Sequence, residues 1–174
     1  IGYLPEHPPL YLDRTPREYL TFVGRAKKIP ASDLPAQIEH VMQVTQIEDV
    51  QHRLMKQLSK GYRQRVGIAQ AILGDPEVII LDEPTVGLDP KQMIEIRELI
   101  RELGKTHTVI LSSHILSQVQ EICQTILIIA IGKLVACDTP QHLEKLFTGQ
   151  ETIELVTEAT QDGARFYCCL PVFI

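Results

Sequence analysis

Apolar residues recur at helical spacing through much of the first half of the chain. Residues 15–18 combine an N-cap threonine, a first-turn proline and a capping-box glutamate, so we expect a helix to begin at Pro16. A second helix is predicted over about 36–46, where apolar residues three and four apart share one face. A third should run from its N-cap, Ser59, to Leu73, because a Gly-Asp-Pro sequence follows. These segments predict a helical subdomain over about residues 12–73.

Short apolar runs replace this pattern in the second half. The run 78–81 is apolar on both faces, as is typical of strands buried in a parallel sheet, and a further strand is predicted at 108–111. Between them, a helix is predicted to begin at Asp89-Pro90 and to end at Gly104. The remaining predicted elements are strands at 1–4, 125–130 and 133–137, with a turn at Gly132, and helices at 115–123 and after Thr139-Pro140. Alternating strands and helices predict an α/β fold.

Composition limits the class of protein. With 174 residues, of which 44% are hydrophobic and 22% charged, the chain is long enough for one domain with one core. A net charge of -5 gives no reason to expect a nucleic-acid partner. The longest apolar run, 126–131, is far shorter than the roughly 20 residues of a membrane-spanning helix. The four cysteines show no C-x-x-C spacing, which favours reduced thiols in a cytosolic protein. The first residue is Ile, from which we expect residues to be missing before it.

Two acidic residues follow the first of the buried strands. Asp82 and Glu83 come directly after the run 78–81, and α/β proteins expose their ligand crevice at the carboxyl ends of such strands. An aspartate there can hold hydrated Mg²⁺, which takes a few carboxylate or phosphate oxygens and keeps several waters. The adjacent Glu83 can reach a water that attacks a phosphate. For the bare pair, the alternative is a solvated loop entrance without chemistry.

A hydroxyl and a glycine lie at the predicted start of the third helix, where Ser59 and Gly61 flank Lys60. A helix N-terminus carries unpaired N–H groups and about half a positive charge, so it receives phosphate well, and glycine lets the backbone approach closely. Taken alone, Ser59 is better interpreted as an ordinary N-cap.

Both motifs carry a family resemblance. Residues 81–90, LDEPTVGLDP, resemble the Walker B motif and D-loop of ABC ATPases, and residues 58–71, LSKGYRQRVGIAQA, are similar to their signature sequence. In that family the glutamate after Walker B is the general base for ATP hydrolysis, the D-loop aspartate works across a dimer interface, and the signature helix contacts the γ-phosphate held by the opposite subunit. The resemblance implies Mg²⁺ at Asp82, catalysis by Glu83, and nucleotide contacts by Ser59, Lys60, Gly61 and Asp89. Many members have glycine where Lys60 stands and glutamine where Tyr62 stands.

Two further residues gain roles from the resemblance. His114, after the strand 108–111, resembles the family's switch histidine, which orients the attacking water and senses the γ-phosphate. Residues 1–11 are similar to the Q-loop region, but the usual glutamine is missing and Glu6 lies nearby, so Glu6 is the corresponding candidate for a contact with Mg²⁺ or water. The alternatives are a structural or solvated histidine and, for Glu6, a proline-rich exposed turn.

The family's phosphate-binding loop has no counterpart in these residues. No G-x-x-x-x-G-K-[ST] sequence occurs, and the nearest imitation, at Gly104, follows a helix instead of a strand. We therefore expect an α/β fold of P-loop NTPase type: a mainly parallel sheet with flanking helices and a helical signature subdomain, lacking the N-terminal strands and the P-loop. Residues 1–148 are expected to be a partial ABC ATPase domain. Residues 149–174 are expected to begin a C-terminal extension, with a weak strand signal near 153–155.

By resemblance, the parent protein is the ATP-hydrolysing subunit of an ABC transporter, with ATP and Mg²⁺ as cofactors. The expected partners are a transmembrane permease subunit and a second nucleotide-binding subunit in a head-to-tail dimer, at the cytoplasmic face of the plasma membrane. The chain alone is expected to hydrolyse ATP poorly or not at all. One alternative is a non-catalytic ABC-like interaction module. A chromosome-maintenance or repair ATPase is disfavoured, because only about fifty residues separate Glu6 from Ser59 where those proteins insert a long coiled coil.

Overall fold

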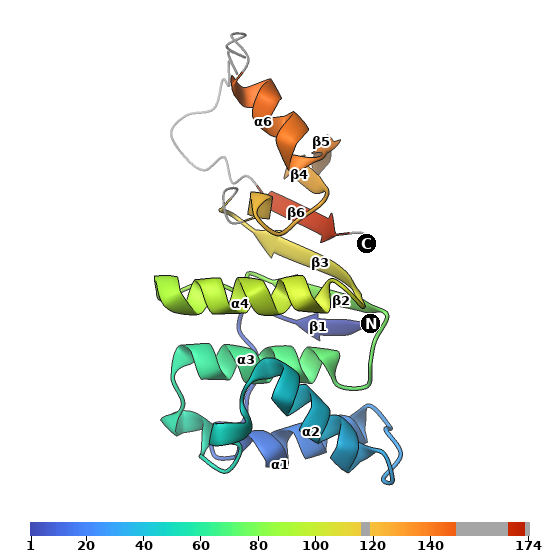
Figure 1. Ribbon diagram of the computed structural model, residues 1–174, viewed down its shortest axis with the longest axis vertical. Helices are drawn as coiled ribbons and strands as arrows, with labels where there is room; N and C mark the ends of the chain where they lie inside the picture. The colour runs from blue at the N-terminus through green and yellow to red at the C-terminus, as the bar shows by residue number, and fades with distance from the viewer. Residues whose placement is uncertain (116–118, 149–166, 173–174) are drawn as a thin grey trace.

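The structure of the chain is a computed structural model that describes residues 1–115, 119–148 and 167–172. Figure 1 shows the strands following one another along the long axis, with α1, α2 and α3 gathered at one end. The elements are β1 (Gly2–Leu4), α1 (Pro16–Ala26), α2 (Leu34–Thr45), two 3₁₀ turns (Glu48–Val50 and Met55–Gln57), α3 (Lys60–Ile72), β2 (Val78–Asp82), α4 (Pro90–Leu103), β3 (Thr108–Ser113), β4 (Ile126–Ala130), β5 (Lys133–Asp138), α6 (Pro140–Thr148) and β6 (Tyr167–Val172).

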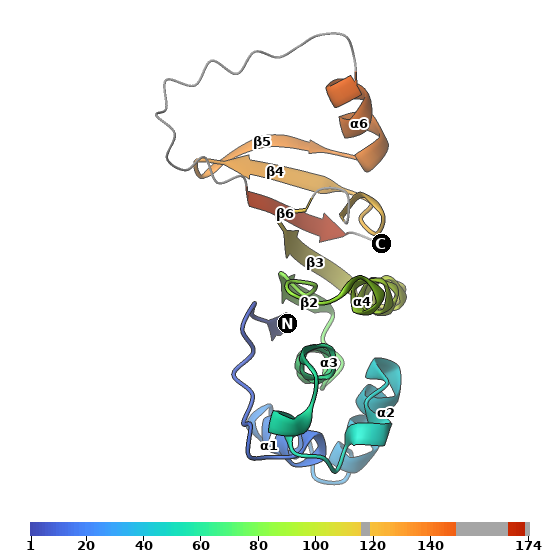
Figure 2. The same cartoon turned by 90° about the vertical axis from the view of Figure 1, so that its left-hand side faces the viewer.

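The strands form one sheet in the order β1-β2-β3-β6-β4-β5. Strands β1, β2 and β3 are parallel, so the α/β fold with a parallel core is confirmed. The sheet as a whole is mixed, because β6 pairs antiparallel with β3 and β4, and β4 pairs antiparallel with β5. Figure 2 shows this succession edge-on, with α4 and α6 on the same side of the sheet. The expectation of a mainly parallel sheet therefore holds only for its β1–β3 half.

Local turn chemistry explains the antiparallel pair. Ile131 and Gly132 connect β4 to β5 with φ values of 51° and 71°. Two successive residues at positive φ are typical of the two-residue turn that closes an antiparallel hairpin. The predicted turn at Gly132 is confirmed.

The helices with a side-chain N-cap, α1, α3 and α4, begin where the sequence predicts. Thr15 and Glu18 form a complete capping box at the start of α1. Helix α2 begins at Leu34, two residues before the predicted start, and its N-cap residue, Asp33, makes no side-chain cap bond. The predicted helix at 115–123 lies partly outside the described residues, and the strand signal near 153–155 lies wholly outside them.

Helix α3 joins the helical end to the sheet. The Lys27 amino group donates to the carbonyls of Gln70, Ala71 and Leu73 at 2.7, 3.2 and 2.6 Å. These carbonyls at the carboxyl end of α3 thereby gain a hydrogen-bond donor. Burial lowers the pKa of Lys27. A Cβ on Gly2 would lie only 2.2 Å from the Ala71 oxygen, so β1 and α3 are in backbone contact. These contacts fix the carboxyl end of α3 against α1 and against the amino end of β1.

Candidate functional site

Polar side chains meet at the carboxyl ends of β2 and β3. The parallel register pairs Asp82 with Ser112, and Glu83 follows directly. The Ser112 hydroxyl donates to Oδ1 of Asp82 and accepts the Glu83 N–H at 3.1 Å. The Glu83 N–H also reaches the Ser112 carbonyl at 3.2 Å. One serine therefore contacts both members of the predicted acidic pair.

Glu83 and His114 form the second contact of this edge. Nδ1 of His114 lies 2.7 Å from Oε1 of Glu83. The Glu83 side chain is 18% exposed and that of His114 is 59% exposed, so the pair lies at the solvent boundary. Glu83 has a φ of 45°, a left-handed conformation that is uncommon for residues other than glycine. The structure thus brings Asp82, Glu83 and His114 together, as the sequence predicts.

Glu6 leaves the sheet at the same edge without joining these side chains. Leu4 pairs with Leu81, so Glu6 and Glu83 each lie two residues beyond a paired position. The Glu6 side chain is exposed and lies 3.9 Å from His7. Among the described residues, no hydrogen bond joins Glu6 to Asp82 or Glu83.

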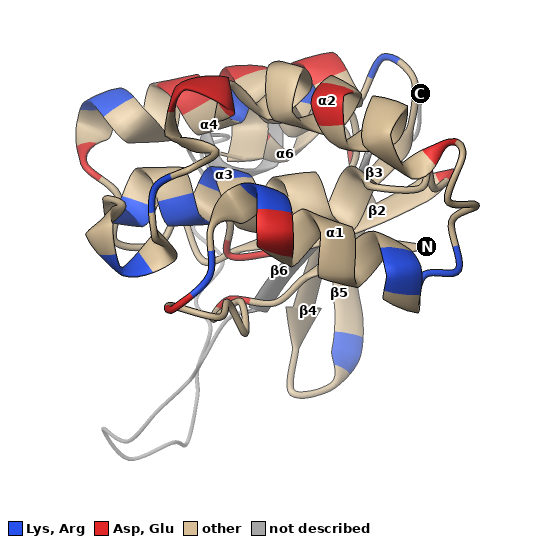
Figure 3. Ribbon diagram, turned by 90° about the horizontal axis from the view of Figure 1, so that it is seen from below, with Lys and Arg blue, Asp and Glu red and all other residues tan. Residues whose placement is uncertain are grey.

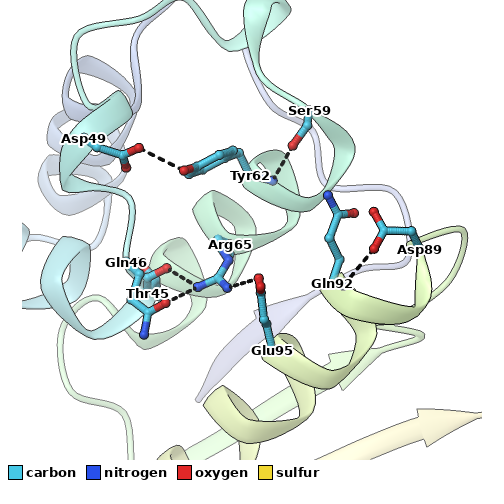
Figure 4. A network of polar contacts seen from close by, with 9 residues as sticks. All are labelled: Thr45, Gln46, Asp49, Ser59, Tyr62, Arg65, Asp89, Gln92 and Glu95. Atoms are coloured by element: carbon cyan, nitrogen blue, oxygen red, sulfur yellow. Dashed lines mark hydrogen bonds and ion pairs between the residues drawn. The ribbon is translucent and has the colours of Figure 1, made fainter.

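The other predicted nucleotide contacts gather at the starts of α3 and α4. Oγ of Ser59 accepts the Tyr62 N–H at 3.3 Å, and Oδ1 of Asp89 accepts the Gln92 N–H at 2.9 Å, as Figure 4 shows. Both side chains are therefore N-caps. Because a hydroxyl can accept and donate at once, Ser59 keeps its own proton for another acceptor.

Close packing joins these two helix starts. A Cβ on Gly61 would lie 2.7 Å from Cδ of Gln92, so the amide of Gln92 lies over Gly61. A Cβ on Gly87 would lie 2.1 Å from the Lys60 amino group, so Lys60 extends along the segment that precedes α4. Figure 1 shows both helix starts on the side of the molecule where the parallel strands end. The predicted signature and D-loop segments thus form one surface of a single chain.

A buried arginine connects the helices that carry this surface. Arg65 on α3 is 8% exposed. Its guanidinium donates to the Thr45 carbonyl at 3.0 Å, to Oε1 of Gln46 at 3.1 Å and to Oε2 of Glu95 at 2.8 Å, as Figure 4 shows. Arg65 therefore ties α2, α3 and α4 together. Tyr62, on the same helix, donates to Asp49 at 2.9 Å, and this bond raises the pKa of Tyr62.

The residues of the sheet edge fit a magnesium ion that receives most of its ligands from elsewhere. No group of three or more His, Cys, Asp or Glu side chains that could hold a metal is found within residues 1–115, 119–148 and 167–172. Asp82 provides one partly exposed carboxylate. Mg²⁺ in nucleotide sites is held by one or two carboxylates together with phosphate oxygens and waters. A single aspartate beside a phosphate-bearing ligand meets this requirement.

Sequence reasoning missed three polar residues of this region. Ser112, Gln92 and Arg65 each act on a residue far away in the chain or on another element. A signal exists for Ser112, because the polar run 112–114 ends one strand as the acidic pair ends the neighbouring strand. For Arg65 the sequence gives no such signal, apart from a charged residue within a largely apolar helix segment.

Two bulk properties bear on partners. None of the helices in the described part of the chain combines the length and apolar character that crossing a membrane requires. Figure 3 shows acidic and basic residues interspersed over the helical end.

Comparison with known proteins agrees with this geometry. A sequence profile of the ABC transporter family matches residues 1–86. An uncharacterised ABC transporter ATP-binding protein of Nostoc is 41% identical over 157 residues, which cover 87% of this chain and 45% of the relative. One from Methanocaldococcus jannaschii is 30% identical over 183 residues, covering 95% of this chain and 70% of the relative.

A solved structure shares the fold. CbiO1 of Clostridium perfringens, described as part of the ABC transporter complex CbiONQ, matches with a TM-score of 0.76 and 27% identity, over 82% of this chain and 58% of CbiO1. The chain therefore spans about half the length of the Nostoc relative and of CbiO1. Its profile match, its relatives and its fold show that the chain belongs to the family of ABC transporter ATP-binding proteins.

Proposed function

We propose that the protein is the ATP-hydrolysing subunit of an ABC transporter and that Glu83 is its general base. The observation that carries the proposal is the contact of 2.7 Å between Glu83 and His114, at the edge where Asp82 ends its strand. A carboxylate that is only 18% exposed and has a histidine beside it can hold a water and accept its proton. His114 orients the carboxylate and the water, and it reports the γ-phosphate to the rest of the site.

Charge neutralisation completes the chemistry. Phosphoryl transfer depends on positioning and on electrostatic stabilisation more than on covalent steps. Asp82 would hold a Mg²⁺ ion, which supplies positive charge to the phosphates when it is bound. Glu6 is proposed as a further contact to Mg²⁺ or water. The sheet edge thus supplies the hydrolytic half of the site.

The second half is proposed to come from another copy. Ser59, Lys60, Gly61 and Asp89 would contact the nucleotide held by the opposite subunit of a head-to-tail dimer. The location of Ser59 and Asp89 on one exposed surface at the starts of α3 and α4 supports this arrangement, because N-terminal N–H groups favour phosphate.

The wider setting follows from the family. We propose residues 1–148 as part of the ABC ATPase domain, of P-loop NTPase type with a helical signature subdomain over about 12–73, and 149–174 as the start of an extension. A transmembrane permease subunit would be the transport partner, at the cytoplasmic face of the plasma membrane. The description of CbiO1 as part of a transporter complex supports a membrane partner.

ATP turnover tests the proposal. It should be measured in the full-length product of the gene that contains these residues, as wild type and as Glu83→Gln. Removing a general base should lower kcat by about a hundredfold or more. Glu77→Gln is the matched control, because Glu77 is an exposed glutamate before the opposite end of the same strand, and its turnover should equal the wild type. Turnover that survives Glu83→Gln unchanged would refute the assignment. A full-length protein without turnover would favour the non-catalytic module.

A further inference from the structure

We propose that Ser112 is a positioning residue that sets the geometry of both carboxylates of the acidic pair. The inference rests on the proposed function and deepens it. Ser112 acts through Asp82 on one side and through the backbone of Glu83 on the other.

The hydroxyl of Ser112 donates one bond and accepts another. Its single proton is donated to Oδ1 of Asp82, and a lone pair accepts the Glu83 N–H at 3.1 Å. A bond from a hydroxyl to a carboxylate is charge-assisted and stronger than a neutral one. Oδ2 of Asp82 has no hydrogen bond among the described residues, so Ser112 holds one oxygen and leaves the other for a cation.

The second contact holds an unusual backbone. Glu83 has a φ of 45°, and a left-handed conformation is disfavoured for a residue that carries a Cβ. Such conformations persist where the surroundings determine them. The Glu83 N–H is held by both Oγ and the carbonyl of Ser112, at 3.1 and 3.2 Å. This conformation directs the Glu83 side chain to His114.

The neighbouring serine has a different role and provides a control. Exposure alternates along β3, so Ser112 and Ser113 face opposite sides of the sheet. Ser113 is 5% exposed, and its Oγ accepts the Ile115 N–H at 3.2 Å. Ser113→Ala therefore removes a buried hydroxyl from the same strand without touching either carboxylate.

Two measurements on four variants test the proposal. The first is ATP turnover against Mg²⁺ concentration in the full-length protein, for Ser112→Ala, Ser112→Thr, Ser113→Ala and Glu83→Gln. Misplacing the base and the magnesium ligand together should lower kcat about tenfold to a hundredfold in Ser112→Ala and raise the Mg²⁺ concentration for half-maximal rate. Ser112→Thr keeps the hydroxyl and should restore both values to within about threefold of the wild type. Ser113→Ala should keep the wild-type Mg²⁺ dependence.

The second measurement needs neither ATP nor metal. Amide hydrogen exchange of the Glu83 N–H, followed by NMR on the 174-residue chain, should speed up about tenfold in Ser112→Ala and remain slow in Ser112→Thr and Ser113→Ala. If Ser112→Ala does not fold, Ser112→Cys replaces it, since a thiol has a similar volume but is a weak hydrogen-bonding group.

The outcomes separate the two proposals. Wild-type kcat, Mg²⁺ dependence and exchange in Ser112→Ala, with Glu83→Gln inactive, would overturn the role of Ser112 and leave the proposed function intact. Full activity in Glu83→Gln would instead overturn the proposed function. Loss of activity in Ser112→Ala without rescue by threonine would also count against positioning by the hydroxyl.

Discussion

Nδ1 of His114 lies 2.7 Å from Oε1 of Glu83, and the two residues follow the ends of adjacent parallel strands. The histidine is the more exposed partner, with 59% of its side chain accessible against 18% for the glutamate. Exposed ion pairs contribute little to folding, because water screens them and ordering two side chains has an entropic cost. We therefore expect the contact to contribute little to the free energy of unfolding, and we propose that it orients the Glu83 carboxylate.

Replacing His114 with alanine should separate these two effects. The free energy of unfolding should stay within about 0.5 kcal/mol of the wild type, as for surface substitutions in general. ATP turnover of the full-length protein should fall about tenfold to a hundredfold, because Glu83 and its water lose a positioning group. Urea unfolding and a steady-state ATPase assay on the same preparation measure both. His40→Ala is the control, since His40 is exposed on α2. A variant that loses stability and activity in parallel would indicate a structural histidine.

Replacing Gly61 with alanine should also affect ATP turnover more than the free energy of unfolding. A Cβ there meets the far end of the flexible Gln92 side chain, which can move aside. Since alanine also favours helix by up to about 1 kcal/mol over glycine, Gly61→Ala should change the free energy of unfolding by no more than about 1 kcal/mol. Its ATP turnover should nevertheless fall at least about tenfold, because the added methyl group covers a surface proposed to receive phosphate.

Two comparisons make the Gly61 prediction specific. Gly2→Ala places its Cβ 2.2 Å from a backbone oxygen of Ala71, which cannot move without shifting α3. That variant should lose about 1–3 kcal/mol of stability, as overpacked cores do. The single variant Gln92→Ala tests whether loss of the Gln92 contact alone is harmful, in which case its turnover should fall as far as that of Gly61→Ala. Full turnover in Gly61→Ala would remove the support for Gly61 as a nucleotide contact.

Arg65 should matter to stability more than its neighbour Arg63. Arg65→Met leaves the Thr45 carbonyl and two side chains without their donor, and unmaking buried polar contacts costs about 1–3 kcal/mol. The partial exposure of Glu95 keeps the loss in that range and below the cost of a fully buried ion pair. Within the described residues the Arg63 side chain makes one hydrogen bond, to the Leu58 carbonyl at 3.1 Å, and Arg63→Met should lose less than about 1 kcal/mol. Urea denaturation of both variants checks the difference, and equal losses would contradict the role of Arg65.

Sequence reasoning succeeded where the signal is local. Thr15 and Asp89 cap helices through residues three positions away, so their motifs contain the whole interaction. Asp82, Glu83 and His114 each follow a buried strand, and the ends of parallel strands meet at one edge. Strand position alone left their roles open, and the resemblance to ABC ATPases supplied them. The predicted start of α2 was two residues late, and its N-cap residue Asp33 makes no side-chain cap bond.

The missed features depend on contacts between distant segments. The pairing of Asp82 with Ser112 depends on the register between β2 and β3. The apolar runs of the two strands do not specify that register. The position of β6 between β3 and β4 was also missed, for another reason. Pro171 lies within β6, and a proline argues against a strand with neighbours on both sides. Pro171 pairs only with Ile110 of β3, because the pairing of β6 with β4 is confined to residues 167–169.

Tyr19 gives the helical end a dependence on alkaline pH. Its side chain is buried on α1 and donates to the side chain of Gln70 on α3. Burial, with a smaller contribution from the nearby Tyr11, raises the pKa of Tyr19 to about 12. The folded chain therefore favours the neutral phenol, whereas an unfolded tyrosine ionises near pH 10. The contribution of Tyr19 to stability is complete below about pH 10 and is lost as the pH rises through about 12.

Comparing Tyr19→Phe with the wild type between pH 9 and pH 12 tests this dependence. The lowered pKa of Lys27 acts in the opposite direction, because the fold favours its neutral form. The contribution of Lys27 to stability therefore rises with pH until the unfolded lysine, with a pKa near 10.4, has also lost its proton. Because Lys27 is present in both proteins, their difference isolates Tyr19. The wild type should lose more stability than Tyr19→Phe above pH 10, and Tyr3→Phe, at a half-exposed ring on β1, should behave like the wild type. Equal losses in wild type and Tyr19→Phe would mean that the phenol ionises without opposing the fold.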